Sequence, residues 1–409
     1  MVFFMCKKTD QKFMRFALRL ARLGAGSTGL NPRVGAVAVR EQRVVGAGTH
    51  LAFGGPHAEG LLIGSTAPEL LRGATLYVTL EPCSHQGKQP PCAPSVANAG
   101  FERVVVALID PNPLVSGQGL EILQRGGLKV DLGVCAKDAA SLNAPFLWSM
   151  KRKRAFVTLK MASGIDGRFA AADGSSQWIT GPRARNLVHQ WRRSSDAIVV
   201  GRGTFMADLP SLNVRLGEEP SEQMRRKLKA RFQIDARSPK PPVRVVLDSE
   251  CRCAEHLEHF CGDKAPKGGR WVIACNESAA ERRIISLQEA GAECWLFPRQ
   301  SGARGIPLPE LFQKMAGSGL IDVMCEGGGS LATEMLKDNL VDRLRLFVAP
   351  ILPSGDRLWV GDMGHQSLSS APRRRLERVK IYDDDVLLES LSMDAASLLD
   401  QWQSEATKA

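Results

Sequence analysis

Residues 82–92 read Pro-Cys-Ser-His-Gln-Gly-Lys-Gln-Pro-Pro-Cys, and residues 56–59 read Pro-His-Ala-Glu. Together these two stretches offer His57, Cys83 and Cys92 as ligands for one metal ion. Three protein ligands leave the fourth tetrahedral position of a zinc ion open for water, as a catalytic zinc site requires and a structural zinc site does not. The two stretches therefore predict a catalytic zinc centre.

The spacing of His57 and Glu59 restricts where these two residues can lie. Within a helix, residues two apart point to nearly opposite sides, because each residue turns the helix by about 100°. His57 and Glu59 can therefore serve one site only from the first turn of a helix, and Pro56 favours a helix that starts there. Cys83 is expected to follow a strand, and Cys92 is expected to open a second helix, whose N-terminus favours thiolates.

These residues predict hydrolytic deamination. Zinc acidifies a water molecule, and Glu59 is expected to take up its proton and to return a proton to the amine that departs from an amidine carbon. Nucleobase deaminases use this arrangement, with a glutamate that is not a zinc ligand and two residues between the cysteines. Here eight residues separate Cys83 from Cys92, which points away from the plain cytidine or tRNA deaminases.

Other readings of the histidines and cysteines exist. His57 could be a core histidine, with both cysteines in a closed structural zinc site, and His85 could be a fourth ligand. The combination with Glu59 favours the catalytic site, with His85 on its rim. A second cluster could also bind zinc, but glutamates alternate with its histidines as on an exposed loop or helix. That cluster comprises Cys251, Cys253, His256, His259 and Cys261.

Length and composition limit the class of protein. The chain has 409 residues, more than one hydrophobic core usually supports, so two domains are expected. No apolar run reaches the length of a membrane span, and the start does not resemble an export signal, so we expect a cytoplasmic protein without membrane contact. The net charge of +11 is spread along the chain and suits an anionic small molecule at least as well as a polynucleotide.

Alternating strand and helix patterns predict a layered α/β fold in both halves. The first half contains a predicted helix at 10–23 and predicted strands at 34–39, 43–46, 74–80 and 103–107. The second half contains predicted strands at 156–161, 197–200, 243–247, 271–274 and 321–325. Residues 216–242 are predicted to form a long loop. The basic run at 151–154 is predicted to be a solvated linker, with the domain boundary near residue 150.

Two glycine-containing turns follow strands in the second half. Residues 201–203 and 327–329 each lie between a predicted strand and a helical pattern. Such turns bring backbone N–H groups close to a phosphate, and two of them at strand ends favour a nucleotide cleft. Neither turn has the G-x-G-x-x-G pattern, so a classical dinucleotide-binding fold is not predicted.

Further stretches carry a resemblance to a known family. They are residues 31–35, 110–113, 159–168, 176–180, 204–215 and 326–331. With the zinc-site stretches, they make the chain similar to the bacterial bifunctional deaminase/reductases of riboflavin biosynthesis. The resemblance spans nearly the whole chain in the expected order.

The resemblance implies two domains and two reactions. Residues 1–150 would form a cytidine-deaminase-like three-layer domain, and residues 151–409 a dihydrofolate-reductase-like domain. The first would deaminate 2,5-diamino-6-ribosylamino-4(3H)-pyrimidinone 5′-phosphate. The second would use NADPH to reduce 5-amino-6-(5-phosphoribosylamino)uracil to its ribitylamino product. One Zn²⁺ per chain and NADPH are the implied cofactors, and a phosphorylated pyrimidine, not a nucleic acid, is the implied partner. A homo-oligomer is left open.

The resemblance also implies residues for the reductase site. The NADPH contacts would be Ala162, Trp178, Thr204, Asp208, Ser249, Gly328, Gly329, Ser330, Leu331, Ala332, Thr333 and Glu334. The substrate contacts would be Ser176, Arg192, Leu212, Arg215 and Glu326, with both arginines as candidates for the phosphate. Lys160 and Asp166 lie in the same motifs without an assigned role. Gly164 and Leu209 replace residues that are usually serine and aspartate in the family.

Two other functions are compatible with these patterns. A polynucleotide-editing deaminase would share the zinc chemistry and use the basic charge. It would also need an aromatic-rich groove, whereas only 6% of the residues are aromatic. A non-catalytic, zinc-stabilised binding protein would have no need of Glu59.

Overall fold

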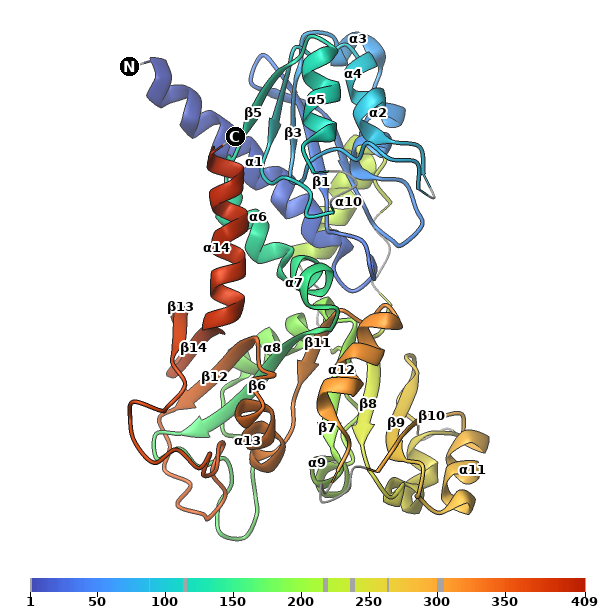
Figure 1. Ribbon diagram of the computed structural model, residues 1–409, viewed down its shortest axis with the longest axis vertical. Coiled ribbons are helices and arrows are strands. Elements are labelled where there is room, and N and C mark those ends of the chain that lie inside the picture. The colour runs from blue at the N-terminus through green and yellow to red at the C-terminus, as the bar shows by residue number, and fades with distance from the viewer. Residues whose placement is uncertain are drawn as a thin grey trace. The chain divides into compact units, whose positions relative to one another are not determined.

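The computed structural model describes residues 2–87, 89–112, 116–215, 220–235, 240–262, 265–299 and 305–408. These residues form two compact units (Figure 1). The first unit comprises Met1–Arg152, Gly217–Pro239 and Ser397–Ala409, and the second comprises Lys153–Leu216 and Lys240–Ala396. The chain therefore passes from the first unit to the second after Arg152, and two later segments count with the first unit.

The first unit contains a five-stranded sheet in the order β2-β1-β3-β4-β5. Its strands are β1 (Gly35–Arg40), β2 (Arg43–Thr49), β3 (Thr75–Val78), β4 (Arg103–Val106) and β5 (Lys129–Leu132). Its helices are α1 (Val2–Ala21), η1 (Arg22–Gly24), α2 (Ala58–Ser65), α3 (Pro68–Leu71), α4 (Cys92–Asn98), α5 (Gln118–Arg125), α6 (Ala136–Leu142), α7 (Ala144–Arg152) and α10 (Pro220–Phe232). Strand β1 runs antiparallel to β2 and β3, whereas β3, β4 and β5 are parallel.

Two glycines let helices approach both faces of this sheet. A side chain at Gly35 in β1 would collide with the backbone of Ala17 in α1, and one at Gly48 in β2 would collide with the backbone of Ala58 in α2. Gly48 pairs with Ala36, the neighbour of Gly35, and successive residues of a strand face opposite sides. Helices α1 and α2 therefore cover opposite faces, and the unit has three layers.

The second unit contains a nine-stranded sheet in the order β10-β9-β8-β7-β11-β6-β12-β14-β13. Its strands are β6 (Phe156–Gly164), β7 (Ala197–Gly201), β8 (Val243–Leu247), β9 (Trp271–Asn276), β10 (Glu293–Phe297), β11 (Asp322–Cys325), β12 (Arg343–Ala349), β13 (Arg374–Tyr382) and β14 (Asp385–Ser392). Its helices are α8 (Pro182–Ser194), α9 (Arg202–Asp208), η2 (Arg252–His259), α11 (Glu281–Glu289), α12 (Leu308–Gly317), α13 (Gly329–Lys337) and the start of α14 (Met393–Lys408).

Helices cover both faces of the larger sheet. Apolar residues of α12 and α13 share one core cluster with β6, β7 and β11. On the other face, α8 packs on the middle of the sheet, and α9, η2 and α11 pack nearer its β10 edge. The strands from β10 to β12 are all parallel, so their C-terminal ends meet at one edge, where α/β proteins commonly bind ligands. Both predicted strand–turn–helix units, β7–α9 and β11–α13, end at this edge.

The prediction of one long loop at residues 216–242 is wrong, because helix α10 (Pro220–Phe232) lies within it. Leu228 of α10 is buried, and Nη2 of Arg231 donates a hydrogen bond to the carbonyl of Val44 in β2 at 3.4 Å. The helix is polar on most sides, so its sequence lacks the apolar stripe on which helix prediction depends.

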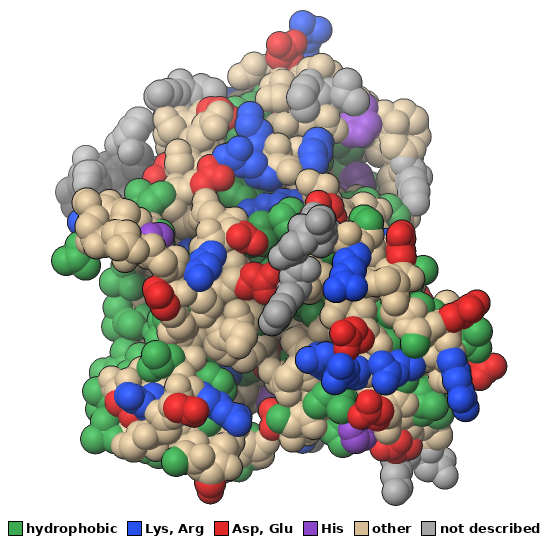
Figure 2. All heavy atoms as spheres, turned by 60° about the horizontal axis from the view of Figure 1, so that its bottom comes forward, with side chains coloured by type: hydrophobic (Ala, Val, Ile, Leu, Met, Phe, Trp, Pro, Cys, Tyr) green, Lys and Arg blue, Asp and Glu red, His purple; other side chains and the backbone are tan. Residues whose placement is uncertain are grey.

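No helix in the described part of the chain is long and apolar enough to cross a membrane. The first helix, α1, starts at Val2 instead of near residue 10 and carries Lys and Arg along its 20 residues. On the molecular face drawn in Figure 2, basic and acidic side chains are interspersed, in agreement with a positive charge that is spread along the chain.

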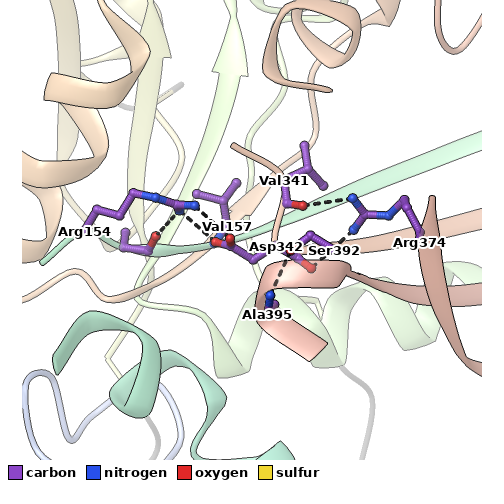
Figure 3. Close-up of polar contacts among 8 residues, drawn as sticks. Arg154, Val157, Val341, Asp342, Arg374, Ser392 and Ala395 are labelled. Atoms are coloured by element: carbon purple, nitrogen blue, oxygen red, sulfur yellow. Dashed lines mark hydrogen bonds and ion pairs between the residues drawn. The ribbon is translucent and has the colours of Figure 1, made fainter. Parts of the chain in front are cut away.

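The basic run at 151–154 is only in part the solvated linker that was predicted, because Lys151, Arg152 and Lys153 are exposed whereas Arg154 is not. Lys151 and Arg152 form the last turn of α7, and Arg154 makes a two-pronged ion pair with Asp342 at the start of β12 (Figure 3). Both hydrogen bonds of this pair measure 2.8 Å, and Asp342 also accepts the backbone N–H of Val157 at 2.8 Å. Arg154, one residue of this basic run, thus helps to hold β6, the first strand of the second unit, in place.

Candidate active sites

Three of the predicted metal ligands meet in the first unit. Sγ of Cys83 lies 3.5 Å from Nδ1 of His57, and Sγ of Cys92 lies 3.4 Å from the same nitrogen. The three ligand atoms all lie within 4.8 Å of one another, and no other His, Cys, Asp or Glu residues form such a group of three in the described ranges. This spacing suits one ion bound to all three atoms at the usual zinc distances of about 2.0–2.3 Å.

The local backbone explains how these residues converge. His57 is the N-cap of α2, and Glu59 lies in the first turn of that helix, as the spacing predicted. Cys92 is the first residue of α4, and its backbone N–H donates to Sγ of Cys83 at 3.3 Å. Cys83 itself lies in the loop after β3, a strand that ends at Val78, slightly before its predicted end.

The charge state of this group depends on burial and on shared protons. Burial raises the pKa of Glu59 to about 7, and the neighbouring Cys83 charge adds to this effect. The hydrogen bond from Cys92 lowers the pKa of Cys83 to about 4, whereas the pKa of Cys92 is raised because it keeps the shared proton. The hydrogen bond with Cys83 raises the pKa of His57. A buried carboxyl group that titrates near neutral pH can both accept and donate a proton.

A cavity of about 380 Å³ opens onto the metal group and Glu59. His85 is exposed at this cavity and is not part of the group of three ligand atoms. His50 also lines it: its Nδ1 donates to the carbonyl of Pro56 at 2.9 Å, and its Nε2 accepts from the amide of Asn31 at 3.0 Å. We did not predict His50 as a site residue, although it precedes His57 by only seven positions.

Glu81 is a second residue that the sequence analysis missed. Its buried carboxylate accepts four backbone N–H groups from the segment that carries Asp110 and Asn112 into the cavity. The four donors are Asp110 (3.1 Å), Gly117 (3.1 Å), Gly119 (2.9 Å) and Leu120 (3.3 Å). Burial raises the pKa of Glu81, and it raises the pKa of Asp110 to about 7. Glu81 therefore fixes the segment that contributes Asp110 and Asn112 to the cavity lining.

The second unit contains a cavity of about 770 Å³ at the C-terminal edge of its parallel strands. All five predicted substrate contacts line it: Ser176, Arg192, Leu212, Arg215 and Glu326. Five of the predicted NADPH contacts also line it: Ala162, Trp178, Thr204, Asp208 and Gly328. Residues from β6, α8, α9 and the β11–α13 turn are thus brought to one site.

The other predicted NADPH contacts do not line this cavity with their side chains. Ser249 and residues 329–334 are absent from its lining, and the side chain of Ala332 is buried in the core. The hydroxyl of Thr333 donates to the carbonyl of Gly329 and accepts from the backbone of Gly361. Gly328, the N-cap of α13, lines the cavity and makes no side-chain cap hydrogen bond, and the start of a helix is a common binding position for phosphate.

A buried ion pair lies at the floor of the larger cavity. Nε and Nη2 of Arg192 donate to the two carboxylate oxygens of Glu326 at 2.6 and 2.8 Å. Although burial works against ionisation, Arg192 holds the pKa of Glu326 below its ordinary value. Lys160 lies half-buried near this pair, and desolvation lowers its pKa. The pair gives the cavity a fixed pattern of charge, while Arg215 lies exposed at its rim.

The second cysteine–histidine cluster is not gathered into a metal site. Cys251 and Cys253 are buried in an apolar cluster, and Cys261 is exposed. Nε2 of His259 contacts the carbonyl of Pro210 at 3.2 Å, and its ring packs on Phe205. These side chains contribute to packing in the described part of the second unit.

Comparisons with known proteins agree with this architecture. Residues 7–108 match the cytidine and deoxycytidylate deaminase zinc-binding region, and residues 155–388 match the RibD C-terminal domain. The riboflavin biosynthesis protein RibD of Aquifex aeolicus is 36% identical over 384 residues, which cover 94% of this chain and 99% of that protein. RibD of Escherichia coli is 34% identical over 382 residues, covering 93% and 98%.

Comparison with solved structures agrees with the sequence comparisons. RibD of Acinetobacter baumannii, in its form 1, superposes with a TM-score of 0.75 at 34% identity, over 95% of this chain and 99% of that one. A deaminase/reductase from Thermotoga maritima superposes with a TM-score of 0.75 at 30% identity, over 94% and 99%. The predicted fold classes, deaminase-like and dihydrofolate-reductase-like, are confirmed. The chain therefore belongs to the RibD family of riboflavin biosynthesis enzymes, with a zinc-binding deaminase domain and an NADPH-dependent reductase domain.

Proposed function

We propose that residues 1–150 deaminate the diamino-pyrimidinone ribosylamine 5′-phosphate and that residues 151–409 reduce the deaminated product with NADPH. The observation that carries this proposal is the convergence of His57, Cys83 and Cys92 on one group of ligand atoms, next to a cavity that His57, Cys83 and the buried Glu59 line. An open metal position and a proton carrier are the two parts that hydrolytic deamination requires.

In the deaminase site, His57, Cys83 and Cys92 would hold a zinc ion. Zinc bound there supplies a Lewis acid that makes a water molecule nucleophilic near neutral pH. Glu59 takes up the proton of that water on a carboxylate oxygen and delivers a proton to the departing amine. Its pKa of about 7 suits both transfers, because neither protonation state is strongly favoured at neutral pH.

In the reductase site, NADPH supplies a hydride to the ribosyl carbon. Ala162, Trp178, Thr204 and Asp208, which line the cavity, would contact the cofactor, and Gly328 with the first turn of α13 would bind one of its phosphates. Ser176, Leu212 and the Arg192–Glu326 pair contact the pyrimidine substrate, and Arg215 binds its phosphate. Ser249 and the side chains of residues 330–334 remain predicted contacts.

The proposed partner is a small phosphorylated pyrimidine and not a nucleic acid or a membrane, and the proposed location is the cytoplasm. Interspersed acidic and basic side chains on the face in Figure 2 favour this choice over a continuous basic track for a polynucleotide. A monomer and a homo-oligomer are both compatible with the proposal.

Glu59→Gln tests the deaminase mechanism. We expect ammonia release to fall by a factor of at least about 10², the usual contribution of a general acid–base. Zinc content should stay near one per chain, and NADPH oxidation with the deaminated substrate should continue. Glu69→Gln, an exposed glutamate of α3, is the matched control and should keep both activities. Retained deamination in Glu59→Gln would overturn the assigned mechanism.

A further inference from the structure

The loop at residues 209–215 follows α9 and carries two proposed substrate contacts, Leu212 and Arg215. Two of its non-glycine residues have left-handed backbone angles, with φ of 38° at Leu209 and 47° at Leu212. This conformation is unfavourable for residues with a side chain and persists only when the surroundings hold it. The loop therefore depends on contacts with its neighbours.

Three side chains supply such contacts. Nη1 of Arg192 donates to the carbonyl of Asn213 at 3.2 Å, and Nη2 of Arg244 donates to the side-chain oxygen of Asn213 at 2.6 Å. Nδ1 of His189 in α8 accepts the backbone N–H of Arg215 at 3.3 Å. The two arginines thus fix the middle of the loop, and His189 contacts the residue whose guanidinium is proposed to bind phosphate.

Only a neutral imidazole can accept this hydrogen bond, and its single proton then resides on Nε2. The charged groups around His189 are Arg192 on the same helix, Arg215 on the loop and Glu326 after β11, with Lys160 of β6 behind Glu326. Burial, followed by Arg192 and Arg215, lowers the pKa of His189, while Glu326 and the Asn213 carbonyl oppose this change. His189 is therefore neutral at physiological pH.

We propose that His189 is a positioning residue of the reductase, which holds Arg215 in place for the substrate phosphate through its unprotonated Nδ1. This inference rests on the proposed reductase function. It assigns His189 no contact with the reacting carbon. Its loss should therefore weaken substrate binding and leave the hydride transfer step largely intact.

Two variants of full-length protein separate the hydrogen bond from simple packing. His189→Leu removes the acceptor, whereas the amide oxygen of His189→Asn can still accept from Arg215. We expect His189→Leu to raise KM for the phosphoribosylaminouracil about tenfold, with kcat changed less than about twofold, because one hydrogen bond is lost. His189→Asn should recover KM to within about threefold of the wild type. His365→Leu, at an exposed histidine, should change neither constant.

The pH profile gives a readout that a purely structural role would not alter. As pH falls below the lowered pKa of His189, the imidazole gains a proton and loses the ability to accept, so KM of the wild type should then rise several-fold more than KM of His189→Asn. The Asn variant also corrects for protonation of the substrate phosphate, whose second pKa is about 6. A wild-type KM that falls relative to the Asn variant in acid would overturn the proposal, since it would identify a cationic His189 that binds the phosphate directly.

A binding measurement distinguishes failure of this inference from failure of the proposed function. Calorimetry with ribose 5-phosphate and the NADPH-saturated full-length variants needs no turnover, and the affinity should follow the order wild type, Asn, Leu. If that order holds but the wild type does not oxidise NADPH with the uracil substrate, the proposed function fails and His189 keeps its role. Equal affinity in His189→Leu, or no binding by the wild type, overturns the inference.

Discussion

A single buried carboxylate, that of Glu81, holds in place a segment that lines the deaminase cavity. Its two oxygens accept four backbone N–H groups, two on each oxygen, from residues that lie 29 to 39 positions later in the chain. Buried N–H groups without an acceptor are costly, so the carboxylate fixes the path of this segment. The path in turn places Asp110 and Asn112 at the cavity.

Glu81→Gln tests this role. Whichever oxygen becomes an amide NH₂ leaves two backbone donors without an acceptor, at a cost of about 1–3 kcal/mol for a buried unsatisfied group. We expect a lower midpoint of thermal inactivation of the deaminase and a higher KM for its substrate, with zinc content unchanged. Glu121→Gln, whose carboxylate is exposed on α5, is the matched control. A Glu81→Gln enzyme with wild-type KM and thermal midpoint would refute the positioning role.

Among single residues, the sequence predicted those whose spacing is set by the chemistry of the zinc site. His57, Glu59, Cys83 and Cys92 could be predicted because a helix start and a zinc ion restrict their separation. Glu81 and His50 could not, because their partners are backbone groups and an amide brought near by folding, and no local pattern marks those partners.

At the scale of elements, the start of the second unit is fixed by one network of charges (Figure 3). Asp342 at the start of β12 pairs with Arg154 and with the backbone of β6. Nη1 and Nη2 of Arg374 donate to the carbonyls of Val341 and Asp342 at 3.0 and 3.2 Å. The network therefore ties together the residues before β6 and the starts of β12 and β13.

Asp342→Asn should destabilise this unit strongly. The Asp342 side chain is 1% exposed and that of Arg154 is 15% exposed, so the substitution leaves a largely buried guanidinium without its counter-charge. Removing one partner of a buried pair typically costs about 3–5 kcal/mol. We expect urea to inactivate the reductase at a clearly lower concentration than in the wild type. Asp338→Asn, at the exposed end of α13, should leave the midpoint unchanged, and an equal midpoint in Asp342→Asn would show that the pair contributes no net stability.

The distribution of charged residues explains which elements could be predicted. The central parallel strands are predominantly apolar and were predicted correctly as β6, β7, β8, β9 and β11, although β6 contains Lys160 and β8 contains Arg244. Strand β12 was missed because it contains Arg343 and Arg345, which are buried against Glu389 of β14. Helix α10 was missed for a related reason, since its polar sequence shows no apolar face. Whether a charged residue is buried cannot be predicted from the sequence when the residue that neutralises its charge lies far along the chain.

At the scale of the whole molecule, the order of the two domains follows from the sequence, but the path of the chain between the units does not. Helix α10 lies between α9 and β8 in sequence and counts with the first unit. Helix α14 begins in the second unit, and from Ser397 onward it also counts with the first. Leu398, Leu399 and Ala406 of α14 are buried. A cut near residue 150 therefore does not yield a complete first unit.

Truncation after Ala396 tests this connectivity. It removes the part of α14 that closely approaches Gly133 after β5 and exposes apolar surface of the first unit. We expect the deaminase to lose thermal stability, because each large buried apolar side chain contributes about 1.5–3 kcal/mol, while the reductase keeps its rate of NADPH oxidation. The control is the full-length variant Gln401→Ala, which replaces an exposed residue of α14 without changing the net charge. Equal deaminase stability after truncation would show that the first unit is complete without α14.

The division of α14 between the units has a consequence for biosynthesis. A ribosome makes the chain from its N-terminus, so the first sheet emerges early, the reductase strands follow, and residues 397–408 of α14 emerge only after both. The deaminase unit can reach its complete fold only when the reductase has already been translated. We therefore expect full deaminase stability in a nascent chain only after residues 397–408 have been translated.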